Sequence, residues 1–174
     1  MKGAKTEIVV FVVSDKDYTL RLKDIISSAS SRYNRICFVS LSKPYDIISD
    51  SLKAHGIDLR KLFFISAGNP SKAEGQVVYI SSPKALTELS ITISKVIEMG
   101  EIEALIFDSL STLLVYEQSS TVLKFAHSLI SLLREKKSSG FLLLMKGSAG
   151  LEVLKDLSML ADRVIEPHAA GIRG

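Results

Sequence analysis

The stretch IEALIFDSLSTLLVYEQSSTV, residues 102–122, carries the pattern from which the fold of this chain is inferred. Within it, residues 103–108 form an apolar run that ends in Asp108, and Ser109 follows at once. A continuous apolar run of this length is typical of a strand buried on both faces of a parallel sheet. Functional groups of such sheets gather at the carboxyl ends of the strands, which is where Asp108 falls. Taken alone, the acid more simply caps the turn that follows it through its own oxygens.

Strand and helix patterns alternate on both sides of this stretch. Buried strands are predicted at 8–14, 35–41 and 140–146, short strands are predicted at 62–66 and 162–167, and a shorter apolar run at 76–81 is left open. Helical spacing of apolar residues predicts helices at 17–31, 44–56, 82–99, 120–137 and 151–160, with Ser82 as an N-cap and Pro83 in the first helical position. Parallel strands need crossover connections, so this alternation predicts a three-layer α/β/α sandwich with a mostly parallel central sheet. We expect residues 1–174 to form a single domain.

Composition excludes several classes of protein. A hydrophobic content of 47% is ample for the core of one domain, and a net charge of +3 is too mild to indicate nucleic acid as a partner. Cys37 is the single cysteine, which rules out a disulfide framework or a thiolate metal cluster.

The apolar run near the N-terminus is short and is interpreted as a first strand, not a signal peptide. No segment reaches the ~20 apolar residues that cross a bilayer. We therefore expect a cytoplasmic protein without a membrane span.

Residues 86–167 resemble the RecA-like ATPases of the KaiC type. The shared features are a helix, a strand that ends in Asp-Ser-Leu-Ser-Thr-Leu-Leu at 108–114, and a helix that contains Phe-x-His-x-Leu at 125–129. A leucine-rich strand ending in Lys146 and an Asp-Arg-Val-Ile strand at 162–165 follow. The resemblance implies a RecA-like sheet, and it makes Asp108 and Ser109 the remnant of the Walker B segment, which holds the magnesium ion of a bound nucleotide.

The chain departs from this family where ATP would bind. Active members carry a glycine-rich loop ending in Gly-Lys-Thr after the first strand, because its N–H groups cradle the phosphates. Here that position reads SDKDYTL, residues 14–20, and no glycine occurs between Gly3 and Gly56. Asp15 and Asp17 would repel a triphosphate. Active members also carry a glutamate pair after the second strand, where this chain has Ser42 and Lys43.

The resemblance and its departures together predict a non-catalytic RecA/KaiC-like homologue that acts as a regulatory or protein-binding module. We expect no catalytic residues, no metal and no cofactor. The partner would be a second copy of the chain or an active RecA/KaiC-like relative. Asp108 would then be structural, with its carboxylate accepting hydrogen bonds from N–H groups of residues 109–111 or from the Ser14 hydroxyl.

A rival interpretation rests on the same segment. Asp-x-Asp-x-Thr after a first buried strand is similar to the nucleophile motif of the haloacid dehalogenase phosphohydrolases. In such a magnesium-dependent enzyme Asp15 and Asp17 would do the chemistry, with Ser40, Lys146 and Asp108 in supporting roles. The simpler alternative for Asp15 and Asp17 is helix N-capping.

Two further features leave their role open. The loop at 146–150, KGSAG, is able to form a backbone nest for an anion, although such loops are usually plain turns. Arg173 is the cation nearest the C-terminal end, where active relatives carry residues that reach a neighbouring subunit. No role is assigned to it.

Overall fold

Seven parallel strands form the centre of the molecule in a computed structural model, which describes residues 5–68 and 76–166. The strands are β1 (Ile8–Val13), β2 (Ile36–Ser40), β3 (Leu62–Ala67), β4 (Val77–Ile80), β5 (Ala104–Asp108), β6 (Ser139–Met145) and β7 (Arg163–Ile165). They are arranged in the order β4-β3-β2-β5-β6-β1-β7, and every described pair is parallel. The predicted sheet is confirmed, and the open run at 76–81 is its edge strand β4.

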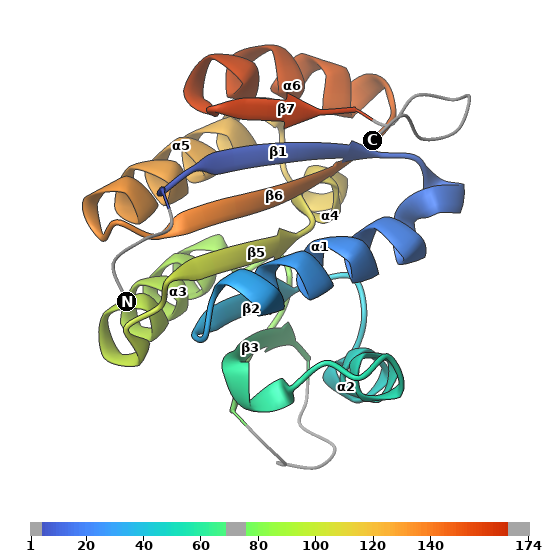
Figure 1. Cartoon of the computed structure of the whole chain (residues 1–174). Helices are drawn as coiled ribbons and strands as arrows, with labels where there is room; N and C mark the ends of the chain where they lie inside the picture. Colours follow the sequence, from blue (N-terminus) through green and yellow to red (C-terminus); the bar gives the residue numbers. More distant parts are fainter. Residues whose placement is uncertain (1–4, 69–75, 167–174) are drawn as a thin grey trace.

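Helices cover both faces of this sheet (Figure 1). They are α1 (Tyr18–Arg32), α2 (Tyr45–Ala54), α3 (Leu86–Gly100), α4 (Leu110–Tyr116), α5 (Ser119–Glu135) and α6 (Ser148–Leu160), with short 3₁₀ turns η1 (Asp15–Asp17) and η2 (Leu59–Lys61). One apolar cluster joins α1 and α2 to the face that carries Phe38 and Ile106. The other joins α3, α4, α5 and α6 to the face that carries Leu105 and Phe107. The sheet and the helices packed on its two faces form the three layers that the sequence predicts.

The sequence-based element boundaries need three corrections. Helix α3 begins at Leu86 and not at Ser82, because Ser82 starts a turn in which its hydroxyl accepts from Lys84 N at 3.1 Å. Helix α4 was not predicted. It forms because Ser109 caps its first turn and because Leu110 and Leu113 are buried in the core. The loop expected at 146–150 is shorter, since α6 already begins at Ser148.

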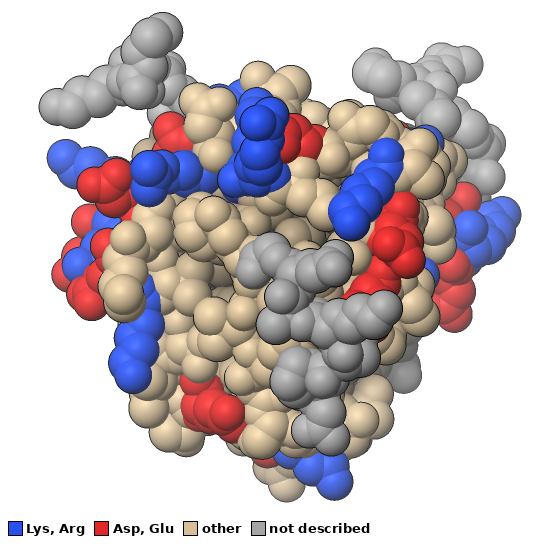
Figure 2. All heavy atoms as spheres, turned by 90° about the horizontal axis from the view of Figure 1, so that it is seen from below, with Lys and Arg blue, Asp and Glu red and all other residues tan. Residues whose placement is uncertain are grey.

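Charged groups of both signs are mixed on the surface. On the side that carries α2 and β3, Lys and Arg side chains lie close to Asp and Glu side chains, and much of the described surface between them is uncharged (Figure 2). The described part of this face therefore lacks the one-sign field that draws nucleic acid to a protein. Within the described residues, no helix combines the length and apolar character needed to cross a membrane.

The parallel register brings the carboxyl ends of the strands to one edge of the sheet. Ser40 on β2 is paired with Asp108 on β5 and with Ser66 on β3, so the three residues form one row. All three are buried. The strand β6 lies between β1 and β5, which places the segment after β1 across β6 from Asp108.

Candidate functional site

Asp108 is the last residue of β5 and is completely buried. Its backbone carbonyl accepts from Leu41 N at 2.9 Å, which ties the end of β5 to the end of β2. The Asp108–Ser109 peptide bond is cis. Ser109 is the N-cap of α4, where its hydroxyl accepts from Thr112 N at 3.3 Å. Asp108 and Ser109 therefore have different surroundings: the acid is in the interior, and the hydroxyl caps α4.

The partner of the Asp108 carboxylate is Tyr18, the first residue of α1. The Tyr18 phenol donates a hydrogen bond to Asp108 Oδ2. The expected partners were the N–H groups of residues 109–111 or the Ser14 hydroxyl, and this expectation is wrong. Ser14 Oγ instead donates to Asp17 Oδ2 at 2.8 Å. The structure thus brings together a tyrosine and an acid that are 90 positions apart, and no motif in the sequence indicated the pair.

Residues of the loop after β2 surround this pair. The Lys43 ammonium lies 5.5 Å from the centre of the Tyr18 ring, within the range of a cation–π interaction. Ser40 Oγ donates to the Lys43 carbonyl at 2.9 Å and so fixes the loop. The Ser42 and Thr112 hydroxyls share a hydrogen bond of 2.9 Å, which connects the loop to α4. Ser42 and Lys43 thus help to enclose the tyrosine and the acid.

Burial sets the electrostatics of the pair. Burial raises the pKa of Asp108 to about 6, although the Tyr18 phenol, the Lys43 charge and the Ser42 hydroxyl each favour the ionised carboxylate. Burial, followed by the Asp108 charge, raises the pKa of the Tyr18 phenol well above its ordinary value, so the phenol stays protonated and acts as a donor. Among the described residues Asp108 Oδ1 has no hydrogen-bond partner. The carboxylate is therefore only half satisfied, which makes its charge costly.

The segment after β1 leads into α1 through one short 3₁₀ turn. β1 ends at Val13, η1 covers Asp15–Asp17, and α1 begins directly at Tyr18. Asp17 occupies the N-cap position of α1, but its side chain makes no capping hydrogen bond to the backbone. Asp17 thus occupies the predicted capping position without making a capping hydrogen bond, because its carboxylate accepts a hydrogen bond from the Ser14 hydroxyl.

The residues of the rival phosphohydrolase interpretation do not converge on a metal. Asp15 is exposed, Asp17 is bonded to Ser14, and Asp108 is bonded to Tyr18. Within residues 5–68 and 76–166, no three His, Cys, Asp or Glu side chains are placed so that they could share a metal ion. Lys146 is exposed. Nothing in this geometry favours the phosphohydrolase.

The remaining candidate positions carry no site. Residues 148–150 of the proposed anion nest are the first turn of α6, and the would-be Cβ of Gly150 lies 2.7 Å from the Met145 carbonyl, so close helix–strand packing explains that glycine. Arg173 lies outside the described residues.

Comparisons with known proteins agree with this fold. The crystal structure of a KaiC-like protein from the hyperthermophilic archaeon Pyrococcus horikoshii is similar to the chain with a TM-score of 0.65 and 14% sequence identity, over 95% of this chain and 75% of that protein. At this identity the likeness shows the RecA-like fold alone. No curated protein sequence matches. A model of a family of unknown function, DUF7504, matches residues 5–167, and the chain therefore belongs to the DUF7504 family.

Proposed function

We propose that this protein is a RecA-like domain that does not hydrolyse ATP and that acts as a regulatory or protein-binding module. In this proposal the acid that would hold the magnesium ion of a nucleotide has become a structural residue. Its partner is a side chain of the same protein, the Tyr18 phenol. A RecA-like fold does not by itself decide whether a domain is active, so the proposal rests on the chemistry of this one site.

The observation that carries the proposal is the hydrogen bond between Tyr18 and Asp108. A magnesium ion at Asp108 would have to displace the phenol from Oδ2 or reach Oδ1, which is buried at the end of β5. Lys43 adds a second obstacle, because its ammonium lies over the Tyr18 ring and repels a cation. The residues that enclose Asp108 therefore oppose metal binding.

The segment after β1 supports the same proposal from the phosphate side. A triphosphate needs several backbone N–H groups that point into one concave loop. Here η1 is followed at once by α1, so the backbone turns directly into the helix. Asp15 and Asp17 add negative charge at the helix end where a phosphate would need donors. We infer that neither half of a nucleotide site is present in working form.

Exposed apolar residues near this edge support a role in binding proteins. Val115 at the end of α4 is 75% exposed, and Leu151 in the first turns of α6 is 63% exposed. The helices α4 and α6 are in contact, and they begin next to the carboxyl ends of β5 and β6. Exposed apolar groups that lie together often mark an interface, while single ones need no explanation.

Calorimetric titration with Mg–ATP tests the proposal. We expect no measurable heat of binding and no release of phosphate from ATP. A dissociation constant in the micromolar range would contradict the proposal, because it corresponds to about 8 kcal/mol of binding free energy at a site that we consider closed. The Asp108→Asn variant is the matched control, since a binding signal that persists in it would come from another part of the protein.

A further inference from the structure

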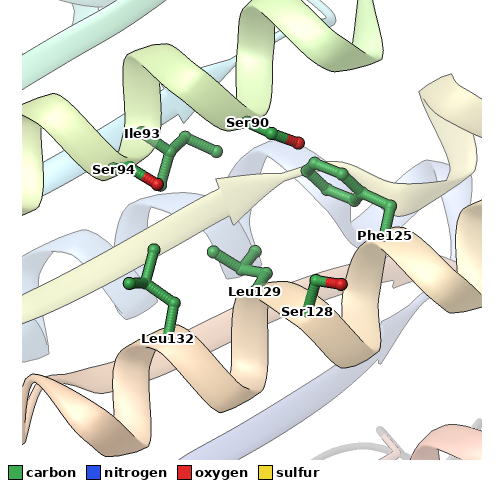
Figure 3. A pocket seen from close by; sticks show the side chains of 7 residues that line it. All are labelled: Ser90, Ile93, Ser94, Phe125, Ser128, Leu129 and Leu132. Carbon is green, nitrogen blue, oxygen red and sulfur yellow. The ribbon is translucent and has the colours of Figure 1, made fainter.

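A groove runs between α3 and α5 on the outer side of the molecule, away from the Tyr18–Asp108 pair. Its volume is about 130 Å³. Ile93, Phe125 and Leu129 are buried and form its floor, and Ser90, Ser94 and Ser128 line its more exposed parts. Side chains of the two helices face each other across it (Figure 3). An apolar cavity of about 150 Å³ holds one benzene molecule, so this groove matches a single large apolar side chain.

An apolar side chain suited to such a groove is exposed on the same surface. Ile91 on α3 is 51% exposed, although it directly follows Ser90 of the groove. Residues three apart are neighbours on the surface of a helix, so Ile91 lies beside Ser94, which lines the groove, while Ile91 itself is not part of the lining. One face of the protein thus carries both a protruding side chain and a recess of matching size. An interface built by a two-fold axis requires this kind of self-complementarity, because each copy contributes the same patch.

The charges along α3 agree with a two-fold arrangement. Glu88 lies three residues before Ile91, and Lys95 lies three residues after Thr92. When two copies of α3 pack antiparallel about the midpoint between Ile91 and Thr92, Glu88 of each copy therefore faces Lys95 of the other. Unlike charges that face each other fix the register of an interface. Between them the accessible residues are Ser90, Ile91, Thr92 and Ser94, which are uncharged and mostly small.

We propose that the α3–α5 face binds a second copy of this chain across a two-fold axis, with Ile91 of each copy in the groove of the other. The inference rests on the proposed function in one respect: it names the partner of the protein-binding module, which the proposed function leaves open. It concerns a surface separate from the Tyr18–Asp108 pair. Its failure would leave the loss of ATP binding untouched, and an ATP-binding protein would in turn leave this interface untouched.

Sedimentation velocity over the micromolar concentration range, with the full chain, is the experiment. We expect the wild type to form a dimer. Ile91→Glu should raise the dimer dissociation constant at least about 30-fold, because it places a charge in the apolar groove of the other copy. Met159→Glu on α6, a residue that is also exposed, is the control and should leave the dimer unchanged.

A charge exchange makes the test specific to the register. Lys95→Glu should weaken the dimer about threefold to tenfold, because it sets two acids against each other at two symmetric positions. The double variant Glu88→Lys, Lys95→Glu restores unlike pairs and should recover the wild-type dissociation constant. Glu88 also accepts from Ser81 N at 3.1 Å, so the melting temperature of each variant is measured alongside. A wild type that remains monomeric overturns the proposal. A dimer that is insensitive to Ile91→Glu, or a folded double variant that dimerises no better than Lys95→Glu, overturns it as well.

Discussion

The segments that follow β5 and β1 reach the same edge of the sheet and differ in how closely they match the KaiC-type ATPases that the sequence resembles. After β5 the chain has Asp108, the Ser109 cap and α4, and of these the resemblance to KaiC-type ATPases implied the Asp-Ser pair at the end of the strand. After β1 it has η1 and the start of α1, and Tyr18 extends from there to Asp108. In the function that we propose, the acid persists without a bound ligand because a neighbouring side chain takes the ligand's place as its partner.

Removing the core contact of α4 should have the largest effect. Leu113 is completely buried, and Leu113→Ala should lower the free energy of unfolding by about 2–5 kcal/mol through the lost burial and the cavity. Val115 lies on the same helix and is 75% exposed, so Val115→Ala should change stability by less than about 0.5 kcal/mol. Urea unfolding of both variants gives the comparison. Equal effects would show that α4 is not anchored as described.

The pH dependence of stability should show the cost of burying the charged Asp108 carboxylate. Its pKa in the folded protein is about 6, above the ordinary value of 3.8, so the folded protein holds this proton more tightly than the unfolded chain does. The associated stability is fully present below pH ~4 and is lost as the pH rises through ~6, by about 3 kcal/mol at most. Subtracting the unfolding free energies of Asp108→Asn from those of the wild type between pH 4 and 7 isolates this contribution. A difference that does not change with pH would contradict the buried, half-satisfied carboxylate.

Loss of the Tyr18 phenol should remove the hydrogen bond that connects the segment after β1 to the end of β5. Tyr18→Phe removes the hydrogen bond to Asp108 and should cost about 1–3 kcal/mol at pH 7, where the carboxylate is ionised. At pH 4 the cost should be smaller, because the protonated acid demands less from its surroundings. Tyr116→Phe, at a half-exposed tyrosine on α4, serves as the control and should be near neutral. A Tyr18→Phe protein as stable as the wild type at both pH values would show that the phenol does not stabilise the Asp108 carboxylate.

The smallest effect is expected at Lys43. Lys43→Gln removes the ammonium over the Tyr18 ring and should cost about 0.5–1 kcal/mol. It should also raise the pKa of Asp108 further, because the Lys43 charge favours the ionised carboxylate. Titration of Asp108 followed by NMR measures that shift. An unchanged pKa would mean that Lys43 does not interact with the pair.

Most of the fold follows from local patterns in the sequence. The runs that became β1, β2, β5 and β6 are continuously apolar because both faces of each strand are covered, and this pattern is visible in the chain itself. α4 was missed because its seven residues are too few to display helical periodicity, and only the cap at Ser109 indicates it.

The candidate site was harder to predict than the fold. Asp108 was identified from the end of an apolar run, but its partner was not. Tyr18 reaches it across the end of β6, so their meeting depends on strand order, which no local pattern encodes. Lys43 was noted only as the residue that replaces a glutamate, and its position over the tyrosine ring follows from the path of the loop after β2.

The central claim is that Tyr18 has taken the place of a magnesium-bound nucleotide as the partner of Asp108. The most direct test is the melting temperature of the wild type and of Asp108→Asn, each measured with and without magnesium. A ligand raises the melting temperature only by binding the folded state. The account predicts that magnesium shifts neither protein. Magnesium-dependent stabilisation of the wild type that disappears in Asp108→Asn would contradict it, because the acid would then still hold its metal.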